Sequence, residues 1–327
     1  QGGDEVLLCL NASDGKEVWK DKYEAEEVKG PPAGFKGGES FKGPRSSPAV
    51  ANGKVCSLGV GGVVSCLDAA SGKVAWRKDT KAKPQFYAAC SPLMVDGLCI
   101  VYVGSGGRGE LTAFELATGE AKWKWSGDGP SYGSPVLMTA EGVKQVVVLS
   151  EKNLVGVGLA DGKLLWQIAL SVGKYPTATP VIDGATVICA GTAVTVVKEG
   201  DKFTTKPAWK GQAPHQYNTP VLKDGLLYGL TGMGKTTNIY CQDAKTGEVL
   251  WTDKAQQGEC GSVLDAGSVL LALSSTSELI AFKPSKDGFE QLAKYKVADT
   301  PTWAEPIIDG NRVFVKDRES LALWTIE

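Results

Sequence analysis

The sequence predicts an all-β fold, a β-propeller of four-stranded blades, and three observations support this. A short phrase in which a glycine precedes a tryptophan by four residues occurs five times, ending at Trp19, Trp76, Trp123, Trp166 and Trp251. A proline-led apolar strand followed in most copies by an N-G or D-G turn recurs upstream of the phrase, and this is a strong hairpin signal. The two elements alternate with a period of about 40–50 residues, the length of one propeller blade.

Each tryptophan phrase is interpreted as strand, tight turn and strand. In C-L-D-A-A-S-G-K-V-A-W an apolar stretch ends at Asp68, and Gly72 supplies the turn residue with positive φ. Asp68 and its equivalents Asn11 and Asp243 can accept hydrogen bonds from the turn backbone. The proline-led hairpin gives the first two strands of a unit and the phrase gives the last two. We name these strands A to D, so the tryptophan lies on strand D.

Residues 1–327 are predicted to form a single propeller domain, because the repeat is uniform and no linker interrupts it. A long inserted loop is expected at residues 21–44, where Phe35 and Phe41 could anchor a partner; a disordered insertion is the alternative. The net charge is −2, with 35 basic and 37 acidic residues well mixed, so nucleic acid is not an expected partner. No apolar run is long enough to cross a bilayer.

The two ends of the sequence are uneven. The first residues read as strands C and D of a blade, and the last segment, from Glu305, reads as strands A, B and C. Either the ends merge into a seventh blade with a spare strand, or an upstream segment completes an eight-blade plan with incomplete terminal blades. We favour eight blades, because the seven-blade arrangement duplicates strand C. In both cases the termini would meet in one blade.

The two motifs together resemble the repeat of a known family. D-A-x-[ST]-G-[KE]-x-x-W preceded by [ST]-P-x-[VI]-x-[DN]-G is similar to the repeat of the PQQ-like β-propellers, over nearly all of the chain. The nearest similarity is to secreted bacterial members, related in architecture to the propeller subunit of the outer-membrane β-barrel assembly machine. The resemblance implies a periplasmic or secreted protein whose indole rings dock between blades. It specifies the fold and leaves the function open, because one superfold hosts unrelated activities.

The repeated tryptophans could stack on a quinone or fill the interblade core. Because they recur at one offset in successive blades, they cannot all face a single ligand, and a structural docking role is predicted for Trp19, Trp76, Trp123, Trp166, Trp209 and Trp251. The family resemblance implies that a quinoprotein dehydrogenase would carry a vicinal disulfide, a calcium held by Glu and Asn, and a catalytic Asp. The sequence has no Cys-Cys dipeptide and few acidic residues near the predicted channel. We therefore expect no catalytic residue, cofactor or metal, with PQQ as the alternative.

The predicted binding surface is the mouth of the central channel. Strand A lines the channel in propellers, so residues just before its proline should converge there with residues of the B–C loops. The candidates are Arg45, Tyr132, His215, Tyr217, Trp303, Glu305, Arg108, Lys152 and Arg318. Aromatic and arginine side chains dominate interface hot spots. The hypothesis is a non-catalytic scaffold that presents loops and the channel mouth to a protein or cell-envelope partner. The alternative is a PQQ-binding, dehydrogenase-like protein with its small-molecule ligand at the same mouth.

Two glycine-rich motifs are not interpreted as sites, and the single histidine is considered only as part of the channel mouth. G-L-T-G-M-G-K-T at 229–236 matches the P-loop pattern, but a strand follows it where phosphate binding needs a helix N-terminus. G-S-G-G-R-G at 104–109 is interpreted as another B–C loop. His215 is the only histidine and therefore the only conventional general base, and we interpret it as a loop residue that could join a ligand site.

The eight cysteines are interpreted as buried apolar residues. Cys9, Cys66 and Cys241 fall on strand C, and Cys56, Cys99 and Cys189 fall on strand B. Repeat-equivalent residues lie in different blades and are not expected to reach disulfide distance. Cys90 and Cys260, at the start of strand A, are expected to be more exposed.

Overall fold

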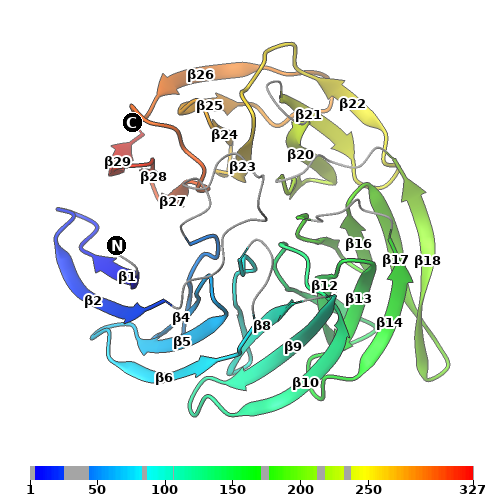
Figure 1. The fold of residues 1–327 in the computed structure, drawn as a ribbon. Coiled ribbons are helices and arrows are strands. Elements are labelled where there is room, and N and C mark those ends of the chain that lie inside the picture. Colours follow the sequence, from blue (N-terminus) through cyan, green and yellow to red (C-terminus); the bar gives the residue numbers. More distant parts are fainter. Residues whose placement is uncertain are drawn as a thin grey trace, which may run out of the picture. The chain divides into compact units, whose positions relative to one another are not determined.

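The fold was analysed in a computed structural model that describes residues 4–25, 44–82, 87–105, 107–170, 177–211, 218–231 and 237–326. Every helix or strand assigned in these residues is a β-strand (Figure 1). The described part of the chain therefore contains no helix able to span a membrane. The chain divides into two compact units, which are described separately. The first unit holds residues 1–179 and 198–204, and the second holds residues 180–197 and 205–327.

The first unit contains a two-stranded sheet and three four-stranded sheets, all antiparallel and paired in chain order. The two-stranded sheet is β1 (Asp4–Leu10) and β2 (Glu17–Glu24). The four-stranded sheets are β3 (Ala49–Ala51), β4 (Lys54–Leu58), β5 (Val63–Asp68) and β6 (Val74–Asp79); β7 (Leu93–Val95), β8 (Leu98–Ser105), β9 (Arg108–Glu115) and β10 (Ala121–Asp128); and β11 (Val136–Ala140), β12 (Val143–Leu149), β13 (Asn153–Gly158) and β14 (Leu164–Ala169).

The second unit continues the pattern with three four-stranded sheets and one three-stranded sheet. Residues 198–204, at the turn between β17 and β18, group with the first unit. The strands are β15 (Val181–Asp183), β16 (Thr186–Cys189), β17 (Thr192–Glu199) and β18 (Lys202–Lys210); β19 (Val221–Lys223), β20 (Leu226–Thr231), β21 (Asn238–Asp243) and β22 (Val249–Thr252); β23 (Gly261–Asp265), β24 (Leu270–Ser274), β25 (Glu278–Phe282) and β26 (Gln291–Lys296); and β27 (Ile307–Asp309), β28 (Arg312–Lys316) and β29 (Leu321–Thr325).

The hairpin turns follow the sequence signals. At the A–B turn of the sheet β3–β6, Asn52 and Gly53 have φ of 51° and 69°, the left-handed backbone that a two-residue hairpin with N-G or D-G adopts. The burial of the side chains differs between the strands of each sheet. The middle strands B and C are largely buried, as in β24, whereas strand D alternates between buried and exposed residues. The apolar core therefore lies between the middle strands of successive sheets within each unit.

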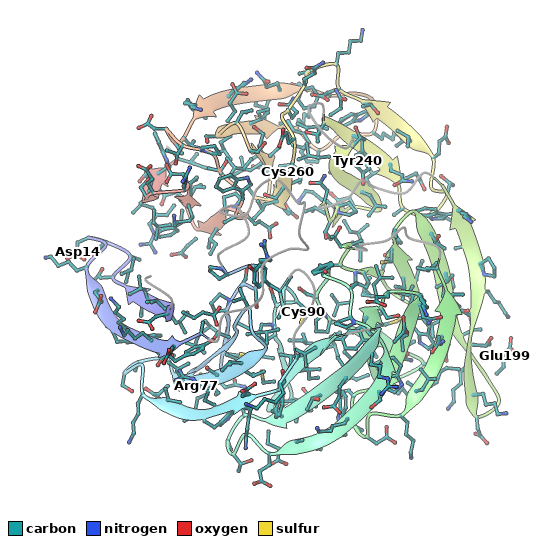
Figure 2. All side chains as sticks on the ribbon, viewed as in Figure 1. Asp14, Arg77, Cys90, Glu199, Tyr240 and Cys260 are labelled. Carbon is teal, nitrogen blue, oxygen red and sulfur yellow. The ribbon has the colours of Figure 1, made fainter. Side chains whose placement is uncertain are left out.

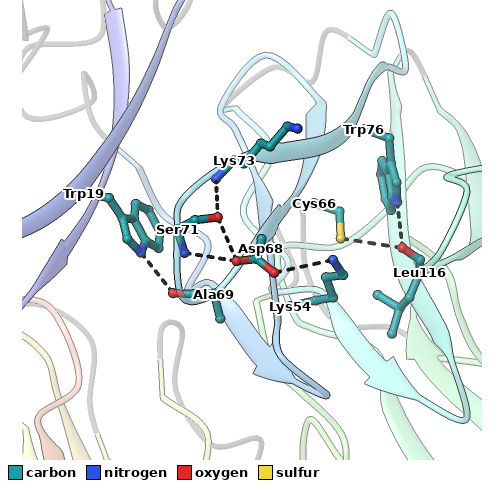
Figure 3. A network of polar contacts seen from close by, with 9 residues as sticks. All are labelled: Trp19, Lys54, Cys66, Asp68, Ala69, Ser71, Lys73, Trp76 and Leu116. Atoms are coloured by element: carbon teal, nitrogen blue, oxygen red, sulfur yellow. Dashed lines mark hydrogen bonds and ion pairs between the residues drawn. The ribbon is translucent and has the colours of Figure 1, made fainter.

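The indole rings of strand D dock onto the next sheet in chain order. Trp19 Nε1 donates to Ala69 O at 2.9 Å, and Trp76 Nε1 donates to Leu116 O at 3.0 Å (Figure 3). In both cases the acceptor lies three residues before the turn glycine of the receiving sheet. The same bond recurs for the pairs Trp123–Leu159, Trp209–Ala244 and Trp251–Ser285, each at 2.8 Å. One indole and one turn thus form a repeated joint between sheets.

The turn position must be glycine for two reasons: its backbone has a positive φ, and the indole of the preceding sheet packs directly on it. Gly72 has φ of 70°, and a Cβ added to it would lie 2.6 Å from the Trp19 ring. The Asp68 carboxylate fixes the turn, because its Oδ1 accepts from Ser71 N at 3.0 Å and from Ser71 Oγ at 2.8 Å (Figure 3). The receiving surface is therefore built from the aspartate and the glycine of one phrase.

Trp166 departs from this pattern. Its Nε1 donates at 2.6 Å to Oε1 of Gln145, which lies on β12 of the same sheet. Gly156 stands directly opposite Trp166 in the β13–β14 register, and a Cβ there would lie 2.1 Å from the indole nitrogen. This indole is 5% exposed, as buried as those of Trp76 and Trp123. A side chain of its own sheet thus supplies its acceptor.

The two-stranded sheet is held to the sheet β3–β6 by polar contacts in addition to Trp19. Arg77, labelled in Figure 2, lies 4.4 Å from the centre of the Tyr23 ring and forms an ion pair with Asp21. The Tyr23 hydroxyl donates to Glu5, whose other carboxylate oxygen accepts from Val60 N at 2.8 Å. A two-stranded sheet is marginal by itself, so this packing stabilises it.

The cysteine predictions need one correction, at Cys90. Cys90 is 2% exposed and therefore not an exposed residue, because it lies inside the core of the first unit, where its thiol donates to Tyr102 O at 3.1 Å. Cys56 and Cys99 come from different sheets, yet their thiols are in hydrogen-bond contact. Both thiols are free and belong to one apolar cluster, so the prediction that repeat-equivalent cysteines form no disulfide stays a prediction. Cys260 is partly exposed.

Candidate partner-binding surfaces

The predicted mouth residues fall into three groups. Arg45, Arg108, Tyr132 and Lys152 lie in the first unit. Trp303, Glu305 and Arg318 lie in the second. His215 and Tyr217 lie outside the described residues, as do most of the inserted loop at 21–44 and Lys235 of the P-loop-like motif. The convergence of all nine residues at one channel mouth stays a prediction.

In the first unit, Arg108 and Lys152 are brought together around Asp128. Arg108 begins β9 and stands directly opposite Asp128, the last residue of β10. The Asp128 carboxylate accepts from Lys152 N at 2.8 Å and from Asn153 Nδ2 at 3.1 Å. Pro130 forms an isolated β-bridge with Ser150 just beyond these contacts. The connection that leaves β10 is thus tied to the B–C loop of the next sheet.

Acidic and basic groups share this surface, which we call the first-unit surface: Arg108, Asp128, Glu151 and Lys152. Arg108 and Lys152 are exposed and Glu151 is partly exposed. Glu151 N donates to Gly129 O at 2.8 Å, and a Cβ on Gly129 would lie 2.4 Å from the Glu151 carboxylate. The glycine therefore permits the close approach of the acidic side chain. The surface suits a partner that offers both charges or hydrogen-bonding backbone groups.

Tyr102 holds the backbone of this surface in place. Its hydroxyl donates to the backbone oxygen of Asp128 at 2.5 Å. Burial, followed by the nearby Asp128 and Glu151 charges, raises the pKa of Tyr102, so the phenol stays protonated and remains a donor. Trp125 packs against it, with ring centres 6.0 Å apart. The backbone that presents Asp128 is therefore fixed by a buried aromatic pair.

A row of hydroxyl groups links the starts of successive A strands in the first unit. Ser47 N donates to Ser91 Oγ at 3.0 Å, Ser91 N to Ser134 Oγ at 2.9 Å, and Ser134 N to Thr179 Oγ1 at 3.0 Å. Each hydroxyl residue directly precedes the strand A proline. Sequence reasoning used the [ST]-P pair only to find the hairpin and missed this role, although the recurring hydroxyl was the available signal.

Arg45 and Tyr132 lie close to this row of hydroxyl groups, because each precedes one of its serines by two residues. The Arg45 guanidinium lies 5.2 Å from the centre of the Tyr87 ring, a cation–π contact. Tyr87 is buried and has a φ of 73°, an uncommon backbone for an aromatic residue. Tyr132 is partly exposed. Arg45 and Tyr132 thus each lie four residues before an A strand, β3 and β11 respectively.

In the second unit, Trp303 and Arg318 directly follow two bridged residues. Thr302 and Asp317 form an isolated β-bridge, and Thr302 Oγ1 donates to Ser274 O at 2.7 Å. Arg318 N donates to Thr300 Oγ1 at 3.1 Å. The bridge repeats the arrangement of Pro130 and Ser150. The connection before strand A is again tied to the B–C loop of its sheet, so Trp303 and Arg318 lie next to each other in the fold.

The side chains of this second-unit surface, Trp303, Glu305 and Arg318, are open to solvent. Trp303 is 62% exposed, a large value for an indole. In the loop that carries Arg318, backbone hydrogen bonds, chiefly from Ser320, lower the pKa of Asp317 and keep its carboxylate charged. The surrounding protein removes part of the water around Glu305 and raises the pKa of its carboxyl. Within the described residues, no group of three or more His, Cys, Asp or Glu side chains is arranged to hold a metal ion.

Comparison with known proteins identifies the family. A family model described as outer membrane protein assembly factor BamB matches residues 3–253. The chain belongs to this family. The relatives include the outer membrane protein assembly factor BamB of Yersinia pestis, 24% identical over 290 residues, which cover 80% of this chain and 69% of the relative. The BamB of Burkholderia pseudomallei is 24% identical over 326 residues, 96% of this chain and 77% of the relative.

A third relative belongs to a different functional class. The quinohemoprotein alcohol dehydrogenase ADH-IIG of Pseudomonas putida is 30% identical over 128 residues, which cover 37% of this chain and 17% of that protein. The family assignment rests on the family model that matches residues 3–253, and this dehydrogenase matches far less of the chain than the BamB relatives do.

Solved structures support the propeller fold. BamB from Moraxella catarrhalis aligns with a TM-score of 0.53 at 15% identity, over 86% of this chain and 96% of that chain. Quinohemoprotein alcohol dehydrogenase from Comamonas testosteroni gives a TM-score of 0.67 at 17% identity, over 95% and 67%. A europium-containing methanol dehydrogenase gives 0.68 at 12% identity, over 95% and 78%. Such identities show the fold alone.

The predicted fold class is confirmed: the chain is an all-β propeller of four-stranded antiparallel sheets. The described residues contain six four-stranded sheets, together with the two-stranded and three-stranded sheets. If the two-stranded and three-stranded sheets are counted as one blade, the number of blades is seven. This is the smaller of the two blade numbers that the sequence left open.

Proposed function

We propose that this protein is a non-catalytic binding scaffold of the bacterial cell envelope that works in the periplasm during the assembly of outer membrane proteins. The observation that carries the proposal is the family match over residues 3–253, supported by two BamB relatives that align with 80% and 96% of the chain. Both relatives are named for assembly of outer membrane proteins, which implies protein partners.

The described surfaces fit a protein-binding role. Trp303, Arg318 and Arg108 are residue types that supply much of the binding energy at protein interfaces. Trp303 and Arg318 directly follow the Thr302–Asp317 bridge, and Arg108 pairs with Asp128 in the β9–β10 ladder, so little loop ordering remains to be lost on binding. Exposed arginine and tryptophan on a rigid backbone suit recognition of extended or partly folded protein segments. The predicted mouth residues are the proposed contacts.

The second candidate is a PQQ-binding, dehydrogenase-like protein. The 128-residue similarity to the Pseudomonas putida alcohol dehydrogenase favours it. A purified sample titrated with PQQ and Ca²⁺ tests it directly, since bound quinone changes its own absorbance. A saturable spectral change that Trp303→Ala abolishes would replace the scaffold proposal with this one.

The scaffold proposal is tested by binding to an unfolded outer membrane β-barrel protein held soluble in dilute urea. The full chain is immobilised, and the apparent Kd is compared for the wild type, Trp303→Ala, Arg108→Ala and the control Leu292→Ala. Leu292 is a half-exposed residue of β26 that belongs to neither surface. We expect each surface variant to weaken binding about tenfold or more, corresponding to about 1.4 kcal/mol or more, and the control to bind normally.

Circular dichroism and thermal unfolding must show that all variants are folded. The proposal is contradicted if the wild type does not bind the barrel protein, or if both surface variants bind as tightly as the control. Loss of binding in only one variant would assign the contact to that unit's surface.

A further inference from the structure

Three buried cysteines meet at one interface of the first unit. Cys56 lies on β4, Cys66 on β5 and Cys99 on β8, and none has any exposed surface. Cys56 and Cys66 stand directly opposite each other in the β4–β5 register. All three belong to one apolar cluster with Trp76. The interface that receives the Trp76 indole therefore also holds two facing thiols on neighbouring strands and a third thiol from the next sheet.

The geometry of the facing pair is close to that of a disulfide. Directly opposite residues of an antiparallel pair point to the same face, with Cα atoms about 4.5–5.5 Å apart. Disulfides span Cα distances of about 4.4–6.8 Å and Cβ distances near 3.8 Å. The backbone separation is therefore suitable, and only a small rotation of the two side chains is needed. The Cys66 thiol points into the interface, where it contacts Leu116 O at 3.8 Å (Figure 3).

The folded interface protects these thiols. The hydrogen bond with Cys56, followed by burial, raises the pKa of Cys66. The contact of Cys56 with Cys66 by itself lowers the pKa of the Cys56 thiol, but contact with Cys99 and burial outweigh it and raise that pKa overall. Because the thiolate is the reacting species, a protonated and inaccessible pair exchanges slowly with any oxidant. Oxidation must therefore precede closure of the interface.

We propose that Cys56 and Cys66 form a disulfide across β4 and β5 while the chain folds in an oxidising compartment. This inference rests on the proposed envelope function in one respect: that compartment supplies the oxidant, a disulfide-bearing small molecule or protein. One cysteine thiolate attacks the oxidant disulfide, forms a mixed disulfide and releases one thiol. The second cysteine then attacks the mixed disulfide and releases a second thiol. The chain loses two protons and two electrons, and the oxidant disulfide becomes two thiols.

The order of folding favours this pair over pairs with Cys99. Cys56 and Cys66 belong to one hairpin, whose contacts are local and form early, whereas Cys99 lies on a later sheet. Once the sheet β7–β10 covers the hairpin, Cys99 remains a buried free thiol beside the bond. The disulfide would join β4 to β5, the strand that pairs with β6 and places Cys66 directly opposite Trp76.

The test is refolding with a defined redox buffer. The full chain is reduced and unfolded, then refolded with reduced and oxidised glutathione, alkylated, digested and analysed by mass spectrometry. We expect a linked pair of peptides containing Cys56 and Cys66, and alkylation of two fewer thiols than the eight in the sequence. Cys66→Ala should lose the linked pair. Cys189→Ala should keep it, because Cys189 is buried but faces Thr192.

A second measurement tests the proposal without a variant, in case Cys66→Ala does not fold. Wild-type protein folded in the reduced state is exposed to the same buffer, and we expect all eight thiols to remain reduced, since the pair is closed to the oxidant. The proposal is overturned if refolded native protein keeps all eight thiols, if Cys99 is linked instead, or if the folded reduced protein oxidises as fast as the refolding chain. These readouts are covalent and need no protein partner, so they stand apart from failure of the proposed function.

Discussion

Trp123 and Trp166 come from the same sequence phrase in consecutive sheets, and their indole nitrogens find different kinds of acceptor. Trp123 donates to the backbone oxygen of Leu159 on the next sheet and packs on Gly162, where a Cβ would lie 2.7 Å from the ring. Trp166 donates to the side chain of Gln145 in its own sheet. Both rings are buried. The phrase that carries the tryptophan is therefore not sufficient to determine its partner.

The difference lies in what the next repeat offers. The turn after Trp123 reads L-A-D-G, with Leu159 three residues before Gly162, and the turns that receive Trp19, Trp76 and Trp209 have the same spacing. The repeat after Trp166 has K-E-G-D at its C–D turn, where only Gly200 and Asp201 connect β17 to β18, whereas the five residues 159–163 connect β13 to β14 in the turn that receives Trp123. Where a receiving turn exists, the indole bonds to it. Where the phrase is missing, a buried glutamine takes the role of acceptor.

The largest expected effect comes from filling a receiving turn. Gly119 and Gly15 have nearly the same positive φ, 72° and 70°, but a Cβ on Gly119 would lie 2.6 Å from the Trp76 ring, whereas a Cβ on Gly15 would meet nothing within 4 Å. Gly15→Ala should cost about 1–2 kcal/mol of unfolding free energy through backbone strain alone. Gly119→Ala should cost about 1–3 kcal/mol more, because the indole must move.

Urea unfolding of the two alanine variants measures this difference. Equal costs would show that the turn glycine serves only its own backbone and that the indole contact contributes little.

A smaller effect is expected from the aspartate of a receiving turn. The backbone N–H groups of Thr246 and Lys245 donate to Asp243 at 2.8 Å and lower the pKa of its carboxyl below the usual 3.8. The folded state thus favours the charged form, so this contribution is present above pH 4 and is lost as the pH falls. Because the turn is exposed, we expect only about a few tenths of a kcal/mol.

Asp243→Asn should remove this part of the pH dependence. The urea midpoint is compared at pH 7 and pH 3 for the wild type, the variant and the control Asp287→Asn, a turn residue of the next sheet. An unchanged pH dependence in Asp243→Asn would argue against the role of the charge.

Much of the fold was readable from the sequence because its determinants are local. Asn52–Gly53 marks a hairpin through its backbone preference, and Gly72 with Asp68 marks a turn. Those signals gave strand order and the four-stranded plan. The single-domain prediction stays a prediction, since the described chain divides into two units.

The site was harder to predict, because it depends on contacts between segments far apart in the chain. The link from Asp128 to Lys152 and the Thr302–Asp317 bridge join loops that no local pattern relates. Gln145 could be identified as an acceptor only once β12 and β14 were placed in one sheet. The meeting of Cys56 with Cys99 likewise depends on which faces of two strands oppose each other, and that is set by register.

A double-mutant cycle between Trp166 and Gln145 tests most directly whether the acceptor, and not the phrase alone, defines each joint. Trp166→Phe removes the donor and leaves the fully buried Gln145 side chain without this bond, and Gln145→Met removes the acceptor. Each single variant should cost about 1–3 kcal/mol, and the double variant should cost less than their sum by about 1–2 kcal/mol.

The matched cycle uses Trp123→Phe with Gln145→Met, because Trp123 bonds to Leu159 and not to Gln145. Urea unfolding of the six proteins should show coupling for Trp166 with Gln145 and additive costs, within about 0.5 kcal/mol, for Trp123 with Gln145. Additive costs in both cycles, or equal coupling in both, would contradict the account.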